Sequence, residues 1–160
     1  MEQFPDRVVY GNKIFRRLNS YWNGLWRSTK GKPNTDSVEL SLLGPILPYL
    51  MVTQLDKVNK RLCFSYFGGT LCNRFGTDIG TGFLDESTSE EIRADIIPHL
   101  ESVLATGHPT IMAADMKNPN VPFRHYECFT LPVPGSCDTA PSLITAITYA
   151  PCKHSARQAG

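Results

Sequence analysis

The strongest periodic pattern in the chain is a long amphipathic helix, STSEEIRADIIPHLESVLAT, at residues 87–106. Its apolar side chains recur on one face, at Ile92, Ile96, Ile97, Leu100, Val103 and Leu104. Ser87 and Glu90 have the spacing of a capping box, and Gly107 is a natural C-cap. Pro98, in mid-helix, predicts a kink in the axis. This helix divides the strand-like segments into a group before it and a group after it.

Two strand-like runs precede the long helix and three follow it. MVTQL and RLCFSYF flank the polar loop DKVNK, which predicts a hairpin. PTIMAADM, FRHYECFTLPV and SLITAITY follow the helix and are separated by segments rich in turn residues. The order predicts an α+β domain, in which a five-stranded antiparallel sheet is flanked by helices and the helices lie on one face.

The N-terminal segment 12–30 predicts a second amphipathic helix. Its apolar stripe contains Ile14, Phe15, Leu18, Tyr21, Trp22, Leu25 and Trp26. One interpretation is that the stripe packs on the sheet of its own domain. The other is that part of it, at Leu18, Trp22 and Trp26, forms an interface with a partner or a second copy.

The glycine-rich stretch FSYFGGTLCNRFGTDIGTGF raises the question of a phosphate site. Its glycines, Gly68, Gly69, Gly76, Gly80 and Gly82, match neither a dinucleotide-binding nor a Walker spacing. We therefore interpret them as turn residues that bound a short helix, TLCNRF, and let the chain wrap closely over the sheet.

Bulk composition excludes several classes of protein. The 160 residues carry a formal net charge of +1, which provides no strong field for nucleic acid or an anionic membrane. We find no signal-peptide core and no run of eighteen apolar residues, and expect a cytoplasmic protein. Five cysteines, without a C-x-x-C pair, predict reduced thiols rather than disulfides or a zinc site.

Several segments resemble one known family. LLGPILPYL leads into the first strand, HYECFTLPVPG and LITAITY form later strands, and the wrap contains Gly76, Gly80, Phe83, Leu84, Asp85 and Glu86. Together with the element order and the helix of Trp22 and Trp26, these segments resemble a PAS-like family found mainly in alphaproteobacteria. The resemblance covers roughly residues 14–150, and we expect a flexible N-terminus at 1–11, a single PAS-like domain at 12–151 and a disordered tail at 152–160.

The resemblance implies a sensory or protein-interaction module whose long helix and sheet enclose a small ligand or only side chains. A hydrophobic ligand pocket would be lined by Phe64, Tyr66, Cys72, Phe75, Phe83, Ile96, Leu100, Ile111, Phe129 and Leu131. Thr145 would add a polar contact. The alternative is a closed core without a ligand, serving dimerisation or scaffolding.

Other functions are less favoured by the residues. Some PAS domains hold haem through a histidine on this long helix, where His99 stands, but a lone histidine is more often a core or surface residue. The other histidines show no metal-ligand spacing with it, and the acidic residues do not suggest an enzyme. We expect a stand-alone module that docks on another protein or on itself as a homodimer, binds neither nucleic acid nor membrane, and has an unknown cofactor.

Overall fold

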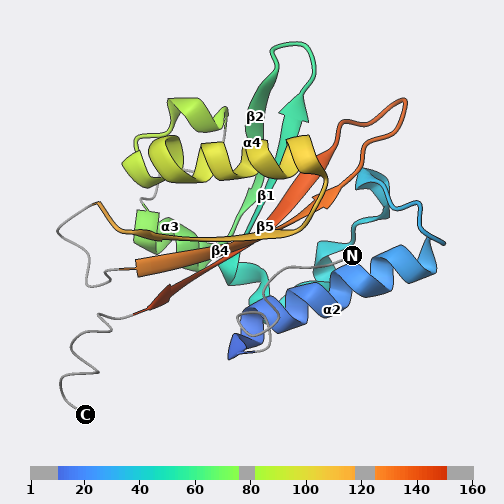
Figure 1. Ribbon diagram of the computed structural model, residues 1–160, viewed down its shortest axis with the longest axis horizontal. Coiled ribbons are helices and arrows are strands. Elements are labelled where there is room, and N and C mark those ends of the chain that lie inside the picture. The colour runs from blue at the N-terminus through green and yellow to red at the C-terminus, as the bar shows by residue number, and fades with distance from the viewer. Residues whose placement is uncertain (1–10, 76–81, 118–124, 151–160) are drawn as a thin grey trace.

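The computed structural model describes residues 11–75, 82–117 and 125–150 of the chain (Figure 1). The sheet consists of β1 (Leu50–Asp56), β2 (Arg61–Phe67), β3 (Thr110–Asp115), β4 (His125–Val133) and β5 (Ser142–Ala150). The α-helices are α2 (Lys13–Ser28), α3 (Gly69–Phe75) and α4 (Ile97–Thr106). Three segments have 3-10 geometry, η1 (Thr35–Ser37), η2 (Leu40–Tyr49) and η3 (Leu84–Glu86), and η4 (Ile92–Ile96) is π-helical. The five-stranded α+β order expected from the sequence is confirmed.

The strands pair antiparallel throughout, in the order β2-β1-β5-β4-β3. The first and last strands of the chain therefore lie side by side, with β5 at the centre of the sheet. This arrangement puts β1, β5 and β4 in the interior positions, and their side chains are the most deeply buried in the sheet.

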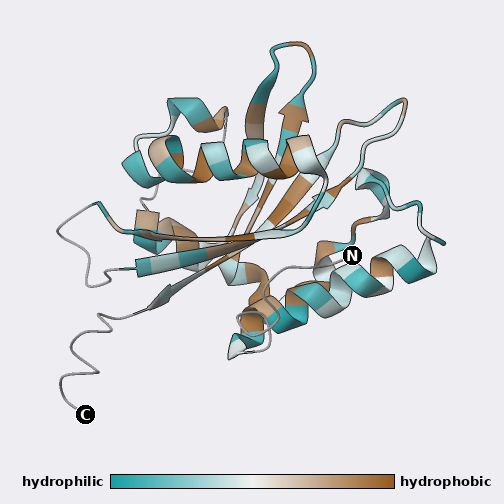
Figure 2. Ribbon diagram, viewed as in Figure 1, coloured by the Kyte–Doolittle hydropathy of each residue, from teal (hydrophilic) through white to brown (hydrophobic). Residues whose placement is uncertain are grey.

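Helices cover both faces of the sheet, so the expectation that they lie on one face is wrong (Figures 1 and 2). The face covered by α4, called the α4 face, has a core that includes Met51, Ile96, Leu100, Tyr126, Leu143 and Ile147. The opposite face, called the α2 face, has a core that includes Phe15, Leu18, Leu43, Phe129, Leu131 and Ile144. Strands β4 and β5 contribute to both cores and need cover on both sides.

Helix α2 packs on the sheet of its own domain, as one interpretation of its stripe predicted. The side chain of Asn12 caps the helix by accepting the backbone N–H groups of Ile14 and Phe15. Phe15 is fully buried and its ring lies against Phe129, with centroids 5.5 Å apart. The helix ends at Ser28, before Gly31, whose φ of 81° only glycine adopts readily.

The long helix begins later than the sequence pattern suggested. Ser89, rather than Ser87, caps it, because the Ser89 hydroxyl accepts the backbone N–H of Ile92. The expected capping box at Ser87 and Glu90 is therefore wrong, because the capping residue lies two positions later. The segment before Pro98 forms a π-helical turn, η4, and the helix continues through the proline as α4 to a left-handed Gly107.

A β-bulge in β2 changes which side chains face each core. Thr53 pairs with Phe64 and Val52 pairs with Tyr66, so Ser65 is the extra residue of the β2 strand. Phe64 consequently faces α4, whereas Tyr66, expected on the same face, packs on the α2 face. The simple alternation expected for this strand holds only up to Phe64.

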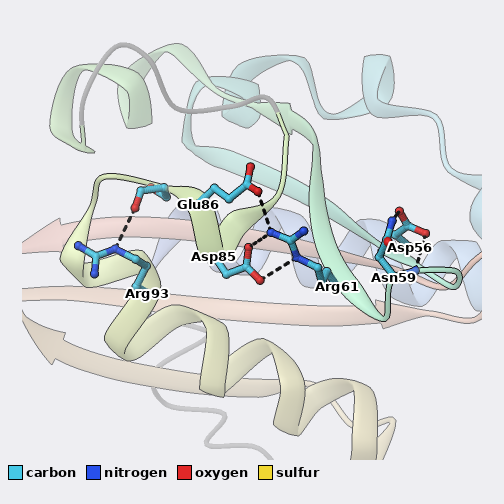
Figure 3. A network of polar contacts seen from close by, with 7 residues as sticks. Asp56, Asn59, Arg61, Asp85, Glu86 and Arg93 are labelled. Atoms are coloured by element: carbon cyan, nitrogen blue, oxygen red, sulfur yellow. Dashed lines mark hydrogen bonds and ion pairs between the residues drawn. The ribbon is translucent and has the colours of Figure 1, made fainter.

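Residues 82–86, the described part of the predicted wrap, lie along β2. Phe64 donates its backbone N–H to the Gly82 carbonyl, and Cys63 forms an antiparallel bridge with Phe83. Arg61 donates to both carboxylates of η3, Asp85 and Glu86 (Figure 3). These ion pairs are exposed, so they add little energy but fix the path of the wrap. Gly76 and Gly80 lie outside the described residues, as do residues 1–10 and 151–160.

Gly68 is expected to tolerate no side chain, because a Cβ there would collide with the backbone carbonyl oxygens of Leu47 and Pro48. We predict that Gly68→Ala lowers the free energy of unfolding by about 2 kcal/mol. The matched control is Gly69→Ala, whose Cβ would meet no atom within 4 Å and which should change stability by less than about 1 kcal/mol. Equal urea midpoints for the two variants would contradict this account of the turn.

Candidate functional site

The residues predicted to line one pocket are divided between the two faces of the sheet. Phe64, Phe75, Ile96 and Leu100 lie on the α4 face, and the ring of Phe75 stands edge-on to Tyr126 at 6.0 Å between centroids. These four are brought together under α4 as expected. Whether they contact a ligand stays a prediction.

The remaining aromatic and aliphatic residues of the predicted pocket lie elsewhere. Tyr66, Ile111, Phe129 and Leu131 pack on the α2 face, so their expected place between the long helix and the sheet is wrong. On β4 the reason is strict alternation: even-numbered Tyr126 and Cys128 face α4, and odd-numbered side chains face α2. The bulge in β2 puts the Tyr66 side chain on the α2 face, where its hydroxyl donates to the Leu47 carbonyl at 3.1 Å.

Two further predicted residues lie at the edge of the α4 core. The Phe83 ring is half-buried beneath the Arg61 guanidinium, 3.8 Å from its centroid, while the next residue, Leu84, is fully buried in the core. Cys72 is half-buried on α3, with its sulfur 4.0 Å from the Phe67 carbonyl oxygen. The sequence analysis thus predicted Phe83 as a pocket residue, whereas the neighbouring Leu84 is the one buried in the α4 core.

A line of buried polar side chains crosses the α4 core. His99, on α4, is 7% exposed, and its Nε2 lies 2.9 Å from the hydroxyl of Thr130 on β4. The Thr130 hydroxyl lies 2.8 Å from that of Thr145, its direct partner on β5. Both threonines are fully buried. The line ties α4 to strands β4 and β5 by hydrogen bonds within apolar surroundings.

Thr53, on β1, adds a buried hydroxyl beside this line. Its cross-strand partners, Phe64 and Leu143, belong to the α4 core, so the Thr53 side chain faces α4 as well. Thr53 is fully buried, and its Oγ1 has no hydrogen-bond partner. A buried hydroxyl without a partner is costly, so this atom marks a place where another polar atom would be stabilised.

Sequence reasoning named His99 and Thr145 but missed Thr130 and Thr53. Threonine is common in strands, and its presence in an apolar run carries no signal of its own. The only available signal was the near-continuous apolar character of β4 and β5, which indicates burial on both faces. A threonine in such a run must find a buried partner.

Burial holds His99 in its neutral form. Loss of hydration disfavours the imidazolium and lowers the pKa of His99 from 6.5 to about 4. One of its ring nitrogens already bonds to Thr130, which is the arrangement of a satisfied core histidine rather than an open haem ligand. Among the described residues, no group of three or more histidine, cysteine and acidic side chains is placed to hold a metal.

Charged groups lie at the rim of the α4 layer, where the helix begins. Asp95 accepts the Tyr126 hydroxyl at 3.0 Å and pairs with the Lys117 ammonium at 2.7 Å. The buried carboxylate of Glu91 accepts the Ser89 hydroxyl and the backbone N–H of Lys117. These contacts join the start of the helix to the end of β3 and leave the centre of the α4 core without a formal charge at neutral pH.

The three residues predicted to form an interface differ in exposure. Leu18 is fully buried in the α2 core, so its expected availability to a partner is wrong. Trp22 and Trp26 are half-buried and lie edge to face, with ring centroids 5.5 Å apart. The Trp22 indole N–H donates to the carbonyl oxygen of Pro132 on β4, at 3.1 Å, whereas the indole nitrogen of Trp26 is buried without a hydrogen-bond partner.

Comparison with known proteins assigns the family. A model of the PAS domain matches residues 12–148, so the chain belongs to the PAS domain family. Among solved structures, the chain is similar to an RNA-binding Light-Oxygen-Voltage receptor, with 16% identity over 69% of this chain and a TM-score of 0.41. The match spans about a third (33%) of that receptor chain. No curated protein matches. None of the helices in the described ranges has the length and apolarity required to span a membrane.

The buried His99 predicts a specific acid sensitivity. The unfolded state takes up a proton near pH 6.5, whereas the folded state does so only near pH 4, so stability is lost as the pH falls between these values. The loss amounts to about 3 kcal/mol. His99→Gln should lack this part of the pH dependence, and the exposed His108→Gln should retain it. Urea denaturation at a series of pH values measures both, and identical slopes for His99→Gln and the wild type would refute the assignment.

Proposed function

We propose that this PAS domain is a sensory module that receives a small ligand between α4 and the sheet and signals through the α2 layer. PAS domains are sensory and signalling modules, and membership of the family supports that coarse assignment. The observation that carries the finer proposal is the two-sided bonding of β4. Thr130 bonds to His99 of α4 on one face, and two residues later the Pro132 carbonyl accepts the Trp22 indole of α2.

Strand β4 is thus a short physical connection between the two layers. A ligand that changes the position of His99 or Thr130 also changes the strand that holds Trp22. Such a ligand shifts the module between two arrangements only to the extent that it binds them with different affinity. The carbonyl of Pro132 and the half-buried Trp22 and Trp26 are the places where α2 would register the change.

The proposed receiver of the signal is a protein, either a second copy of the chain or another partner. Trp22 and Trp26 offer aromatic surface of the kind that anchors protein interfaces, and α2 is only partly covered by its own domain. A formal net charge of +1 does not favour nucleic acid as the partner. Catalysis is not part of the proposal, because the buried polar line contains no activated nucleophile or charged acid–base pair.

The alternative function is an interaction module with a filled core and no ligand. Its support is the packing of the α4 core, where Leu84, Ile96, Leu100 and Leu143 are each fully inaccessible to solvent. In this case α2 and its tryptophans would still provide the contact surface. The two functions differ in whether the α4 core ever holds a molecule other than the protein.

Native mass spectrometry of the purified protein, followed by denaturing spectra of the same sample, tests the choice. The proposal predicts a mass excess that disappears on denaturation, because a non-covalent ligand is released when α4 leaves the sheet. The same native spectrum gives the oligomeric state. A polypeptide mass without any excess, both as purified and after incubation with a metabolite extract, would contradict the sensory function and favour the filled core.

A further inference from the structure

We propose that the ligand of the α4 core is a small uncharged molecule with a hydrogen-bonding oxygen, and that the hydroxyls of Thr53 and Thr145 receive this oxygen. The inference rests on the proposed sensory function and adds the chemical class of the ligand and the groups that select it. It is carried by two observations: the unpartnered hydroxyl of Thr53 and the positions of these two threonines on adjacent strands.

The two hydroxyls stand at the corners of one four-residue square on the α4 face. Thr53 pairs with Leu143 and Met51 pairs with Thr145, so Thr53 and Thr145 are diagonal neighbours on β1 and β5. Diagonal neighbours have Cα atoms roughly 7–8 Å apart and side chains somewhat closer. One oxygen atom at hydrogen-bonding distance from each hydroxyl, about 2.8 Å, bridges two hydroxyl oxygens that lie up to about 5.6 Å apart. Met51 and Leu143, at the other corners, provide an apolar floor.

The hydrogen-bonding capacity of the site is unused at Thr53 and partly used at Thr145. Each threonine hydroxyl has one donor hydrogen and two acceptor positions. Thr145 shares one contact with Thr130, which in turn bonds to His99, whereas the Thr53 oxygen has no partner. A ligand oxygen can therefore bond to Thr53 without breaking the line that holds α4 to the sheet.

Electrostatics exclude a charged ligand from this position. Among the described residues, the ionisable groups that face the α4 core include His99 from α4, Tyr126 and Cys128 from β4, and Tyr149 from β5. Burial keeps these four neutral at pH 7, because it lowers the pKa of His99 and raises the pKa values of Tyr126, Cys128 and Tyr149. The charged groups at the rim already have partners: Asp95 pairs with Lys117, and the Glu91 carboxylate accepts hydrogen bonds from Ser89 and from the backbone N–H of Lys117. An ion in the centre would lose its hydration without gaining a counter-ion.

Four ring-matched probes test the class of ligand: benzyl alcohol, toluene, benzoate and benzylammonium. Dissociation constants at pH 7 would be measured by NMR titration of the folded full-length protein, following the resonances of Thr53, Thr145 and His99. Benzyl alcohol should bind about fivefold more tightly than toluene, which corresponds to one net hydrogen bond. Benzoate and benzylammonium should bind more weakly than toluene.

Two variants at one position assign the recognition to the hydroxyl. Thr53→Val keeps the shape of the side chain and removes its oxygen, so benzyl alcohol should lose its advantage over toluene while the fold is retained. Thr53→Ser keeps the hydroxyl and should keep the advantage. Ligand-free Thr53→Val should be at least as stable as the wild type, because it removes a buried group that has no partner.

Three results would overturn the inference. The first is binding of benzoate or benzylammonium as tight as that of benzyl alcohol, and the second is an unchanged preference for benzyl alcohol in Thr53→Val. The third is the absence of binding by every probe. It would mean that the Thr53 hydroxyl bonds to a water molecule or has only a structural role. A releasable mass excess in the native spectrum would still support a sensory function in each case, so failure of the ligand class is distinguishable from failure of the proposed function.

Discussion

The structure depends on the burial of both faces of the central strands. Strands β4 and β5 supply side chains alternately to two separate cores, one under α4 and one under α2. An antiparallel sheet with such strands exposes a large apolar surface unless both sides are covered. Helix α2 is therefore part of the folded unit, because Phe15 and Leu18 complete the second core.

Alternation also explains how a polar line and an apolar core occupy the same face. Thr130 and Thr145 pair directly across β4 and β5 and share the α4 face with Leu143 and Ile147. Their hydroxyls bond to each other and to His99, so burial leaves these groups satisfied. Thr53 is an exception on this face, because its hydroxyl has no hydrogen-bond partner, and the Trp26 indole N–H lacks a partner on the side of α2. Both atoms lie where the proposed signal is received or reported.

Periodicity in the sequence was sufficient to predict the two amphipathic helices, apart from the start of the long one, and five strands in an antiparallel sheet, but not the order of the strands in that sheet. The faces of the strands were harder to predict. The extra residue at Ser65 reverses the alternation between Phe64 and Tyr66, and no residue type in RLCFSYF signals a bulge. The side chains of Phe129 and Leu131 were placed under α4 because one covering layer was assumed. The apolar run CFTLPV, read as a strand buried on both sides, would have indicated the second layer.

The candidate site was predictable only in its location. His99 was considered for its place on the long helix and Thr145 as a polar contact to the pocket, but the pairing of Thr130 with Thr145 depends on strand register, which no local pattern determines. The hydroxyl of Thr53 becomes informative only when its burial and lack of a partner are known. Likewise, the bond from Trp22 to Pro132 joins residues 110 positions apart in the chain.

The central claim is that β4 couples the α4 core to α2, and NMR of the two tryptophan indole N–H groups tests it most directly. Thr130→Val removes the contact with His99 and should shift the resonance of Trp22, which bonds to the same strand, much more than that of Trp26. Thr53→Val makes the same replacement on β1, at a buried hydroxyl that has no hydrogen-bond partner, and should leave the Trp22 resonance of the ligand-free protein in place. A folded Thr130→Val protein with an unchanged Trp22 signal would contradict the coupling.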